Sequence, residues 1–253
     1  MRIVVHGNSV ALRVRPPRER AADGTYAEVL RAAGHEVTTV ARAGAMLAES
    51  FATLEDDVVV RAPEVVVLQH GVVEVCPRRT IRALNNRTIE NYYLNGVLGA
   101  PYRSGGGLDA AVHLGARIAN GLVRRAATLL GLRWAWMTLP RFLEVMERTI
   151  AVLRKETGAQ VIVLGINPTS ARVEGQLPGT DAAIAAANAG LAALCVRLGD
   201  AVRFVDPAQV LGADTSALVP DGIHYSVEGH RRIAAHLAAL LADAPPSAHA
   251  RGS

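Results

Sequence analysis

The sequence is poor in several features that mark particular classes of protein. It has two cysteines, Cys76 and Cys195, which are too few for a disulfide framework, and both lie among apolar residues as buried structural cysteines do. Aromatic residues make up 4% of the chain, and its 27 lysines and arginines form no dense tract, so we expect no nucleic-acid partner. No apolar run reaches the length of a membrane span, and Met1 and Arg2 lead straight into an apolar strand pattern rather than a secretory leader. We therefore expect a cytoplasmic protein with no membrane partner.

The sequence also lacks the motifs of cofactor-dependent enzymes. It contains no Gly-x-Gly-x-x-Gly loop and no Walker-type loop, which counts against dinucleotides and nucleoside triphosphates. Its histidines form no cluster with cysteine or aspartate at metal-ligand spacing. One of them, His230, is interpreted as a solvated or capping residue of the last helix. We expect neither a cofactor nor a metal.

The chain is rich in apolar residues: 50% of its residues are hydrophobic and 20% are charged. A chain of 253 residues with this composition can bury a large core, so we expect a single domain over residues 1–243. Residues 244–253 are rich in proline, serine and alanine, and we expect a disordered tail there.

Strand-like apolar runs alternate with helical patterns along the chain. This alternation predicts an α/β fold, a three-layer α/β/α sandwich around a central parallel five-stranded sheet. The expected strands are residues 3–6, 35–40, 65–69, 160–164 and 202–205. The expected helices are residues 26–33, 46–57, 141–156, 181–198 and 226–241, and Ser226 is the expected cap of the last one.

The connection between the third and fourth strands, about residues 76–140, is far longer than such links usually are. We expect a helical insert in this segment. Two interpretations stay open: a helical pair that shields a sheet edge, or a lid that selects substrate above the carboxyl ends of the strands.

Three residues with the chemistry of acyl transfer lie at element boundaries. Ser9 follows the first expected strand, where open α/β sheets place their ligand crevice. Asp221 and His224 lie together just before the last expected helix. A serine hydroxyl needs a base to take its proton, and a histidine whose tautomer is set by an aspartate is suited to that role. Taken singly, Ser9 reads as a turn serine and His224 as a helix-entry histidine, so the hypothesis of a catalytic triad depends on the pairing.

The two ends of the chain resemble blocks of the SGNH (GDSL-like) hydrolase family. The segment Gly7-Asn8-Ser9 is similar to the family's Gly-Asp-Ser at the end of strand one. The segment from Asp221 to His224 is similar to its Asp-x-x-His before the final helix. The resemblance spans nearly the whole chain apart from the insert and the tail, and it implies the flavodoxin-like SGNH-hydrolase fold. It also implies that Ser9 is the nucleophile, His224 the base and Asp221 its orienting partner.

Two middle blocks carry a weaker resemblance. Gly44 is the counterpart of the family's glycine after strand two, and the backbone N–H groups of Ser9 and Gly44 would then form the oxyanion hole. Where the family has Gly-x-Asn-Asp after strand three, this chain has Gly71-Val72-Val73-Glu74. Because valine has no donor, the hole lacks one member, a loss that costs about 10²–10³ in rate in other acyl-transfer enzymes. The Gly71 amide and His70 are candidates to complete it.

Several residues near the predicted nucleophile are candidates to contact substrate. Arg13 and Arg15 form a basic edge after Ser9, and Arg78 follows the third strand. Arginine suits carboxylate or phosphate, so we expect a small-molecule or glycan acyl ester or thioester that is anionic. A solvated basic loop is the alternative. We include His70 and also Asn8, which replaces the family's aspartate with a neutral side chain of the same size.

These observations favour a serine-dependent acyl-ester hydrolase or acyltransferase that works through an acyl-enzyme. One alternative is a catalytically weak relative that binds a glycan or an acyl carrier, which the changes at Asn8 and Val73 motivate. Another alternative is a flavodoxin-like nucleotide binder, which only the sheet pattern supports.

Overall fold

The structure is a computed structural model that describes residues 1–15, 19–21, 24–78, 122, 125–127, 129–212 and 215–242. Most of the expected insert at 76–140 and the whole expected tail at 244–253 lie outside these residues. Both remain predictions.

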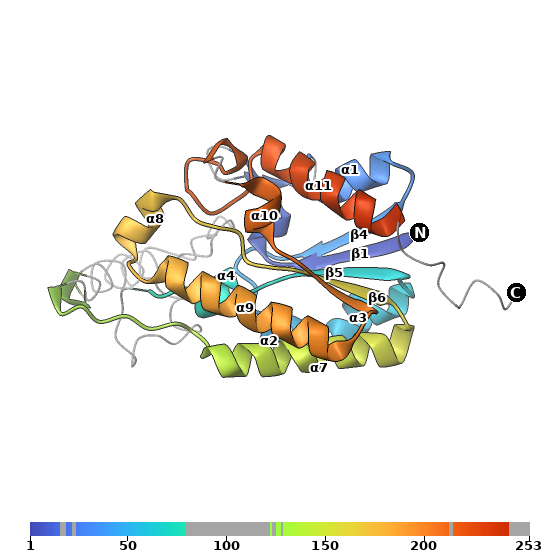
Figure 1. The fold of residues 1–253 in the computed structure, drawn as a ribbon, viewed down its shortest axis with the longest axis horizontal. Coiled ribbons are helices and arrows are strands. Elements are labelled where there is room, and N and C mark those ends of the chain that lie inside the picture. The colour runs from blue at the N-terminus through green and yellow to red at the C-terminus, as the bar shows by residue number, and fades with distance from the viewer. Residues whose placement is uncertain are drawn as a thin grey trace, which may run out of the picture.

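A five-stranded sheet of parallel strands forms the centre of the molecule, in the order β4-β1-β5-β6-β7 (Figure 1). Its strands are β1 (Arg2–Gly7), β4 (Glu36–Ala41), β5 (Val65–Gln69), β6 (Gln160–Leu164) and β7 (Val202–Val205). Each strand agrees with an expected one to within a residue or two at its ends. The predicted parallel sheet is confirmed.

Helices cover both faces of this sheet (Figure 1). Along β5, Val65 and Val67 pack into one apolar cluster while Val66 and Leu68 pack into the other, because successive strand side chains point to opposite faces. The helices on the first face are α1 (Tyr26–Ala32), α10 (Pro207–Leu211) and α11 (Val227–Ala242). Those on the second face are α2 (Leu47–Phe51), α3 (Leu54–Asp57), α4 (Val72–Val75), α7 (Leu139–Thr157) and α9 (Thr180–Leu198). The three-layer α/β/α sandwich is therefore confirmed.

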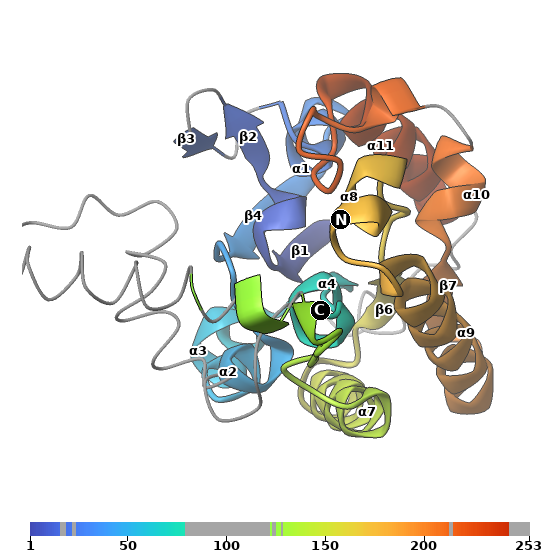
Figure 2. The ribbon, with the colours of Figure 1, turned by 90° about the vertical axis from the view of Figure 1, so that its left-hand side faces the viewer.

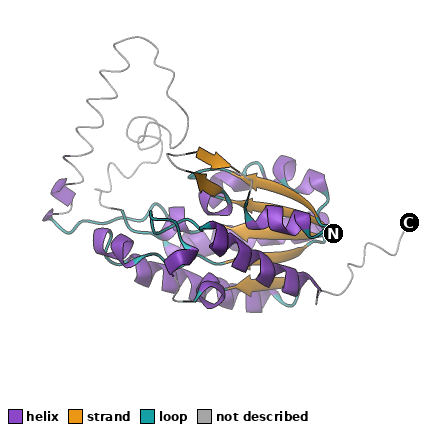
Figure 3. Ribbon diagram, turned by 90° about the horizontal axis from the view of Figure 1, so that it is seen from above, coloured by secondary structure: helices purple, strands orange, loops and turns teal. Residues whose placement is uncertain are grey.

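Short elements are where the structure departs from the prediction. The helix expected over 46–57 is divided into α2 and α3. The hairpin β2 (Arg13–Arg15) and β3 (Glu19–Ala21), which lies apart from the main sheet, was not expected (Figures 2 and 3). Helix α8 (Ala171–Gln176) and the four-residue α4 were not expected either. Elements of this length cover too few turns or alternations for a hydrophobic period to be read.

Helix α9 corrects a second expectation, that no segment is long and apolar enough to cross a membrane. By length and composition alone, α9 is long and apolar enough to cross a membrane. In the fold, however, Ile184, Leu191 and Leu194 are buried in the core against the sheet. Its alanine-rich sequence gives α9 an apolar outer face as well, which explains the composition.

The strand order places a crevice at the carboxyl ends of β1 and β5. Along the chain, the next strand of this sheet after β1 is β4, which lies on one side of β1. The strands β5, β6 and β7 lie on the other side of β1. Loops that leave β1 and β5 therefore diverge, and open α/β sheets bind ligands at such a point. Figure 2 views the molecule from this side.

Candidate active site

Ser9 lies directly beyond the end of β1, in the short 3-10 helix η1 (Ser9–Ala11). The side chain of Asn8 caps this turn, since its Oδ1 accepts a hydrogen bond from Val10 N at 3.0 Å. The chain can leave the sheet here because residue 7 is glycine: a Cβ on Gly7 would lie 2.8 Å from the carbonyl oxygen of Gln69. Close packing of β1 on β5 thus determines where the serine hydroxyl emerges.

His224 reaches Ser9 from the loop before α11. Its Nε2 atom lies 2.9 Å from Ser9 Oγ, and its Nδ1 atom lies 2.6 Å from Asp221 Oδ2. The other carboxylate oxygen of Asp221 accepts hydrogen bonds from Ile223 N at 2.8 Å and His224 N at 3.0 Å. One aspartate therefore both folds the turn and orients the imidazole ring. The structure brings together all three residues of the predicted triad.

The hydrogen bonds to Asp221 determine its protonation. Partial burial acts to raise its pKa, but the bonds from the His224 ring and from the two backbone N–H groups outweigh burial and lower the pKa below its usual value. The group is therefore a carboxylate at neutral pH and accepts the Nδ1 proton of the imidazole. The Nε2 atom then has its lone pair directed at the serine hydroxyl.

A cavity of about 160 Å³ opens beside the serine and the histidine. Gly44 lies on its wall with φ +69°, a left-handed conformation that favours glycine. Val73 also lies on the wall. Arg78 and Trp136 line the cavity too, and the Arg78 guanidinium stacks 3.8 Å from the centre of the Trp136 ring. Most of the remaining lining is apolar: Val72, Cys76, Pro77, Val173, Leu177 and Ile223.

No protein-family model and no curated protein matches the chain. Solved structures do. TesA is 15% identical with a TM-score of 0.56, covering 95% of this chain and 98% of that chain. A catalytic mutant of Axe2, an acetylxylan esterase from Geobacillus stearothermophilus, is 15% identical with a TM-score of 0.56, covering 93% and 91%. A lipase/acylhydrolase from Enterococcus faecalis is 15% identical with a TM-score of 0.56, covering 95% and 94%. The fold is that of the SGNH hydrolases. At this identity the likeness concerns the fold alone.

Three of the predicted site residues lie elsewhere than expected within this SGNH fold. The Gly71 N–H donates to Glu74 Oε2 at 2.9 Å, so it is engaged and cannot serve as an oxyanion donor. Asn8 and His70 are buried and line a separate cavity of about 10 Å³, whose described lining does not include Ser9 or His224. Neither can contact a substrate there. The side chains of Arg13 and Arg15 lie outside the part of the chain that the structure describes.

The structure pairs His70 with a second buried histidine, His6, a contact that the sequence did not predict. His6 Nδ1 and His70 Nε2 are 3.2 Å apart, and Glu74 Oε1 lies 3.9 Å from the other ring nitrogen of His70. Burial, more than the opposing fields of Asp57 and Arg42, lowers the pKa of His6 to about 4. Burial also lowers the pKa of His70. The signal in the sequence was a His-Gly pair after each of two apolar strands.

His230 corrects another expectation, because it is fully buried rather than solvated. Its Nδ1 accepts a hydrogen bond from Tyr26 N at 3.3 Å, and its ring meets the edge of Tyr225 at 5.3 Å. Helix α11 therefore docks onto α1 through a polar side chain. Cys76 and Cys195 are buried as expected, and burial raises the pKa of their thiols to about 12 and about 11.

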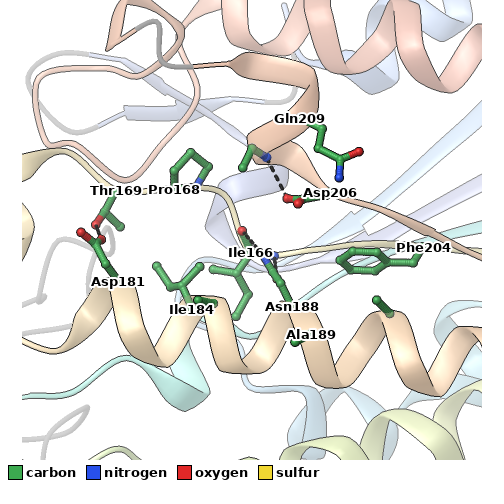
Figure 4. A pocket seen from close by; sticks show the side chains of 13 residues that line it. Ile166, Pro168, Thr169, Asp181, Ile184, Asn188, Ala189, Phe204, Asp206 and Gln209 are labelled. Atoms are coloured by element: carbon green, nitrogen blue, oxygen red, sulfur yellow. Dashed lines mark hydrogen bonds between the residues drawn. The ribbon is translucent and has the colours of Figure 1, made fainter.

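A second cavity, of about 610 Å³, lies between α9 and the start of α10 (Figure 4). Thr169 lines both cavities and donates to Asp181 Oδ1 at 3.0 Å. The Asn188 side chain bonds both the N–H and the carbonyl of Ile166, each at 2.8 Å. These polar groups hold the loop after β6 against α9. The described lining of this cavity contains no serine, cysteine or histidine, so the Ser9–His224 pair lies at the smaller one.

Proposed function

We propose that the protein is a serine-dependent acyl-ester hydrolase of the SGNH type. The observation that carries the proposal is the continuous chain of contacts from Ser9 Oγ to His224 Nε2 at 2.9 Å and from His224 Nδ1 to Asp221 Oδ2 at 2.6 Å. A serine, a base and an orienting carboxylate in this geometry are the machinery of nucleophilic acyl transfer. Their position on an SGNH fold, whose other members here include an acetylxylan esterase and an acylhydrolase, supports the same reaction.

In the proposed reaction Ser9 Oγ attacks the carbonyl carbon of the ester while its proton passes to His224 Nε2. The carbonyl electron pair moves onto oxygen, and the N–H groups of Ser9 and Gly44 stabilise that oxyanion. Collapse of the tetrahedral intermediate breaks the bond to the alcohol oxygen, which takes the proton from His224 and leaves an acyl-Ser9. A water that gives its proton to His224 then attacks the acyl group and releases the carboxylic acid. Asp221 stabilises the imidazolium formed in each half of the cycle.

The cavity suggests a short acyl group. Its volume of about 160 Å³ is well below the roughly 300–1,000 Å³ of sites that take drug-sized ligands. We extend the proposal to an acyl group that carries a negative charge, because Arg78 is among the residues that line this cavity. In Arg78→Met, the ratio of kcat/KM for a succinyl half-ester to that for a neutral butyryl ester should fall. An unchanged ratio would contradict the proposal of an anionic acyl group but would not affect the proposal of a short one.

A second candidate, a catalytically weak protein that binds an acyl carrier or a glycan, draws support from Val73. This side chain lies on the cavity wall where the SGNH resemblance expects an asparagine donor. A fluorophosphonate probe separates the two candidates, because it labels an activated serine and leaves an ordinary one unlabelled. Acyl transfer to an alcohol instead of water uses the same acyl-enzyme and is detected by adding an alcohol acceptor.

The decisive test is Ser9→Ala. We expect loss of p-nitrophenyl acetate hydrolysis and of fluorophosphonate labelling, with circular dichroism and Tm unchanged. The matched control is Ser50→Ala, because Ser50 is a buried serine of α2 that lies off the described wall of the cavity. This variant should keep wild-type turnover. Full activity in Ser9→Ala would refute the proposal. A wild-type protein that is neither active nor labelled would favour the second candidate, the binding protein.

A further inference from the structure

Gln69 is the last residue of β5 and the one polar side chain in a row of that strand. Val65, Val67 and Gln69 alternate along β5 toward the face covered by α1 and α11. Gln69 has an exposed fraction of only 3%, so its amide must find partners inside the protein. Where those partners lie decides what the residue does.

The backbone of Gln69 contacts the chain that leads to the nucleophile. Its carbonyl oxygen accepts a hydrogen bond from Asn8 N at 3.2 Å. In the sheet register Gln69 lies opposite Gly7, at the last pair of residues before β1 turns toward Ser9. Gln69 therefore fixes one side of the Ser9–His224 contact.

The side chain of Gln69 contacts the chain that leads to the base. Its Nε2 donates to the hydroxyl of Tyr225 at 3.0 Å, and its Oε1 accepts from the hydroxyl of Tyr26 at 2.9 Å. Tyr225 is the residue after His224 and has an exposed fraction of 1%. Burial raises the pKa of both tyrosines well above the usual value, so both hydroxyls keep their protons.

The other neighbour of His224 is fastened as well. The Asn167 side chain donates to the carbonyl of Ile223 at 2.7 Å. Both chain neighbours of His224 are thus held by side-chain amides, one from Gln69 at the end of β5 and one from Asn167 in the loop after β6. Of these two side-chain amides, the one of Gln69 belongs to the residue that also bonds the segment of the nucleophile, through its carbonyl and Asn8 N.

We infer that Gln69 is a positioning residue of the proposed acyl hydrolase: through Asn8 N and the Tyr225 hydroxyl it sets the distance between Ser9 Oγ and His224 Nε2. The inference rests on the proposed function. By this inference a buried glutamine that touches neither substrate nor triad affects the rate of the chemical step. The reason is that small displacements of reacting groups lower the rate steeply.

Two substitutions of the same kind test it. Tyr225→Phe and Tyr26→Phe each remove one hydroxyl that bonds to the Gln69 amide, and both side chains are fully buried. Only the first loosens the residue beside His224. We expect kcat for p-nitrophenyl acetate to fall about tenfold in Tyr225→Phe with KM unchanged, and to stay within about twofold in Tyr26→Phe. Both variants should lower Tm by similar amounts. Gln69→Met, which breaks both bonds, should lower kcat at least as far as Tyr225→Phe.

A spectroscopic readout makes the test independent of turnover. The Nδ1–H proton shared between His224 and Asp221 should give a downfield resonance that shifts or broadens in Tyr225→Phe and stays in place in Tyr26→Phe. Wild-type kcat together with an unmoved resonance in Tyr225→Phe would overturn the inference, as would equal losses of kcat in the two phenylalanine variants. A wild type that is inert and unlabelled by fluorophosphonate is a different result, because it removes the proposed function while the resonance still reports on positioning. Should Gln69→Met fail to fold, the two phenylalanine variants, which each delete one oxygen, decide the matter.

Discussion

The Nε2 atom of His224 lies 2.9 Å from Ser9 Oγ, and Asp221 holds the loop that brings it there through three hydrogen bonds. Two of these go to backbone N–H groups and one to the imidazole ring. The aspartate therefore has two separable duties, to shape the turn and to select the tautomer of the histidine.

Asp221→Asn should separate these duties. The amide oxygen can still accept from the backbone N–H groups, so the fold and Tm should persist. The side chain then loses the charge that stabilises the imidazolium, and kcat should fall by about 10³–10⁴. The control is Asp206→Asn, since Asp206 caps α10 through Ala208 N at 2.9 Å in the same way and lies outside the proposed machinery. Esterase assays on both variants check this, and equal kcat values would contradict it.

Val73→Asn should raise the rate. The substitution adds a donor to the cavity wall where the resemblance expects the third member of the oxyanion hole, and such a donor is worth about 10²–10³ in kcat. Because the geometry was not shaped around it, we expect a gain of only about tenfold in kcat, with some loss of Tm. Val73→Ala serves as the control for altered packing. A folded Val73→Asn with unchanged kcat would mean that another group already fills this role.

Glu74→Gln should destabilise the protein and disturb the Gly44 loop. The carboxylate is fully buried and accepts from Leu47 N at 2.6 Å and Gly71 N at 2.9 Å. A glutamine turns one of these acceptors into a donor that faces a donor, at a cost of about 1–3 kcal/mol. Urea unfolding measures the loss. Glu147→Gln, which removes a partly exposed carboxylate paired with Arg197, should leave the urea midpoint almost unchanged. Equal shifts in both variants would contradict a stabilising role for the buried Glu74 carboxylate.

Acid should weaken the fold before the carboxylates titrate. His6 has its pKa lowered from 6.5 to about 4, so below pH 6.5 the unfolded chain takes up a proton that the folded chain refuses. The free energy of unfolding should therefore be highest above pH 6.5 and fall as the pH drops toward 4, by on the order of 3 kcal/mol from this residue. Its neighbour His70 acts in the same direction.

His6→Gln is the variant that tests this slope. Urea unfolding at several pH values should give a flatter dependence than in the wild type, whereas His236→Gln, on the exposed side of α11, should keep the wild-type slope. An unaltered slope in His6→Gln would show that the proton uptake occurs elsewhere.

Much of the fold could be predicted because the buried strands are plain apolar runs. β5, for example, reads Val-Val-Val-Leu-Gln and is covered on both faces. The meeting of Ser9, Asp221 and His224 could be predicted because Ser9 and His224 both lie at element boundaries and because the two segments that hold them resemble blocks of one family. The contacts of Gln69 could not, since they depend on which residues meet across the sheet. The burial of His230 could not be predicted either, because a histidine on an amphipathic helix is compatible with both the buried and the exposed face.

The separation of Ser9 and His224 along the chain has a consequence for how the protein matures on the ribosome. The ring nitrogen that meets Ser9 Oγ belongs to a residue that is translated 215 residues later, in the loop that precedes α11. The nascent chain therefore carries Ser9 without its partner while all of these residues are made, and the two meet only after the strands and helices between them have docked. Acylation of Ser9 would then be a marker of completed folding of this part of the chain.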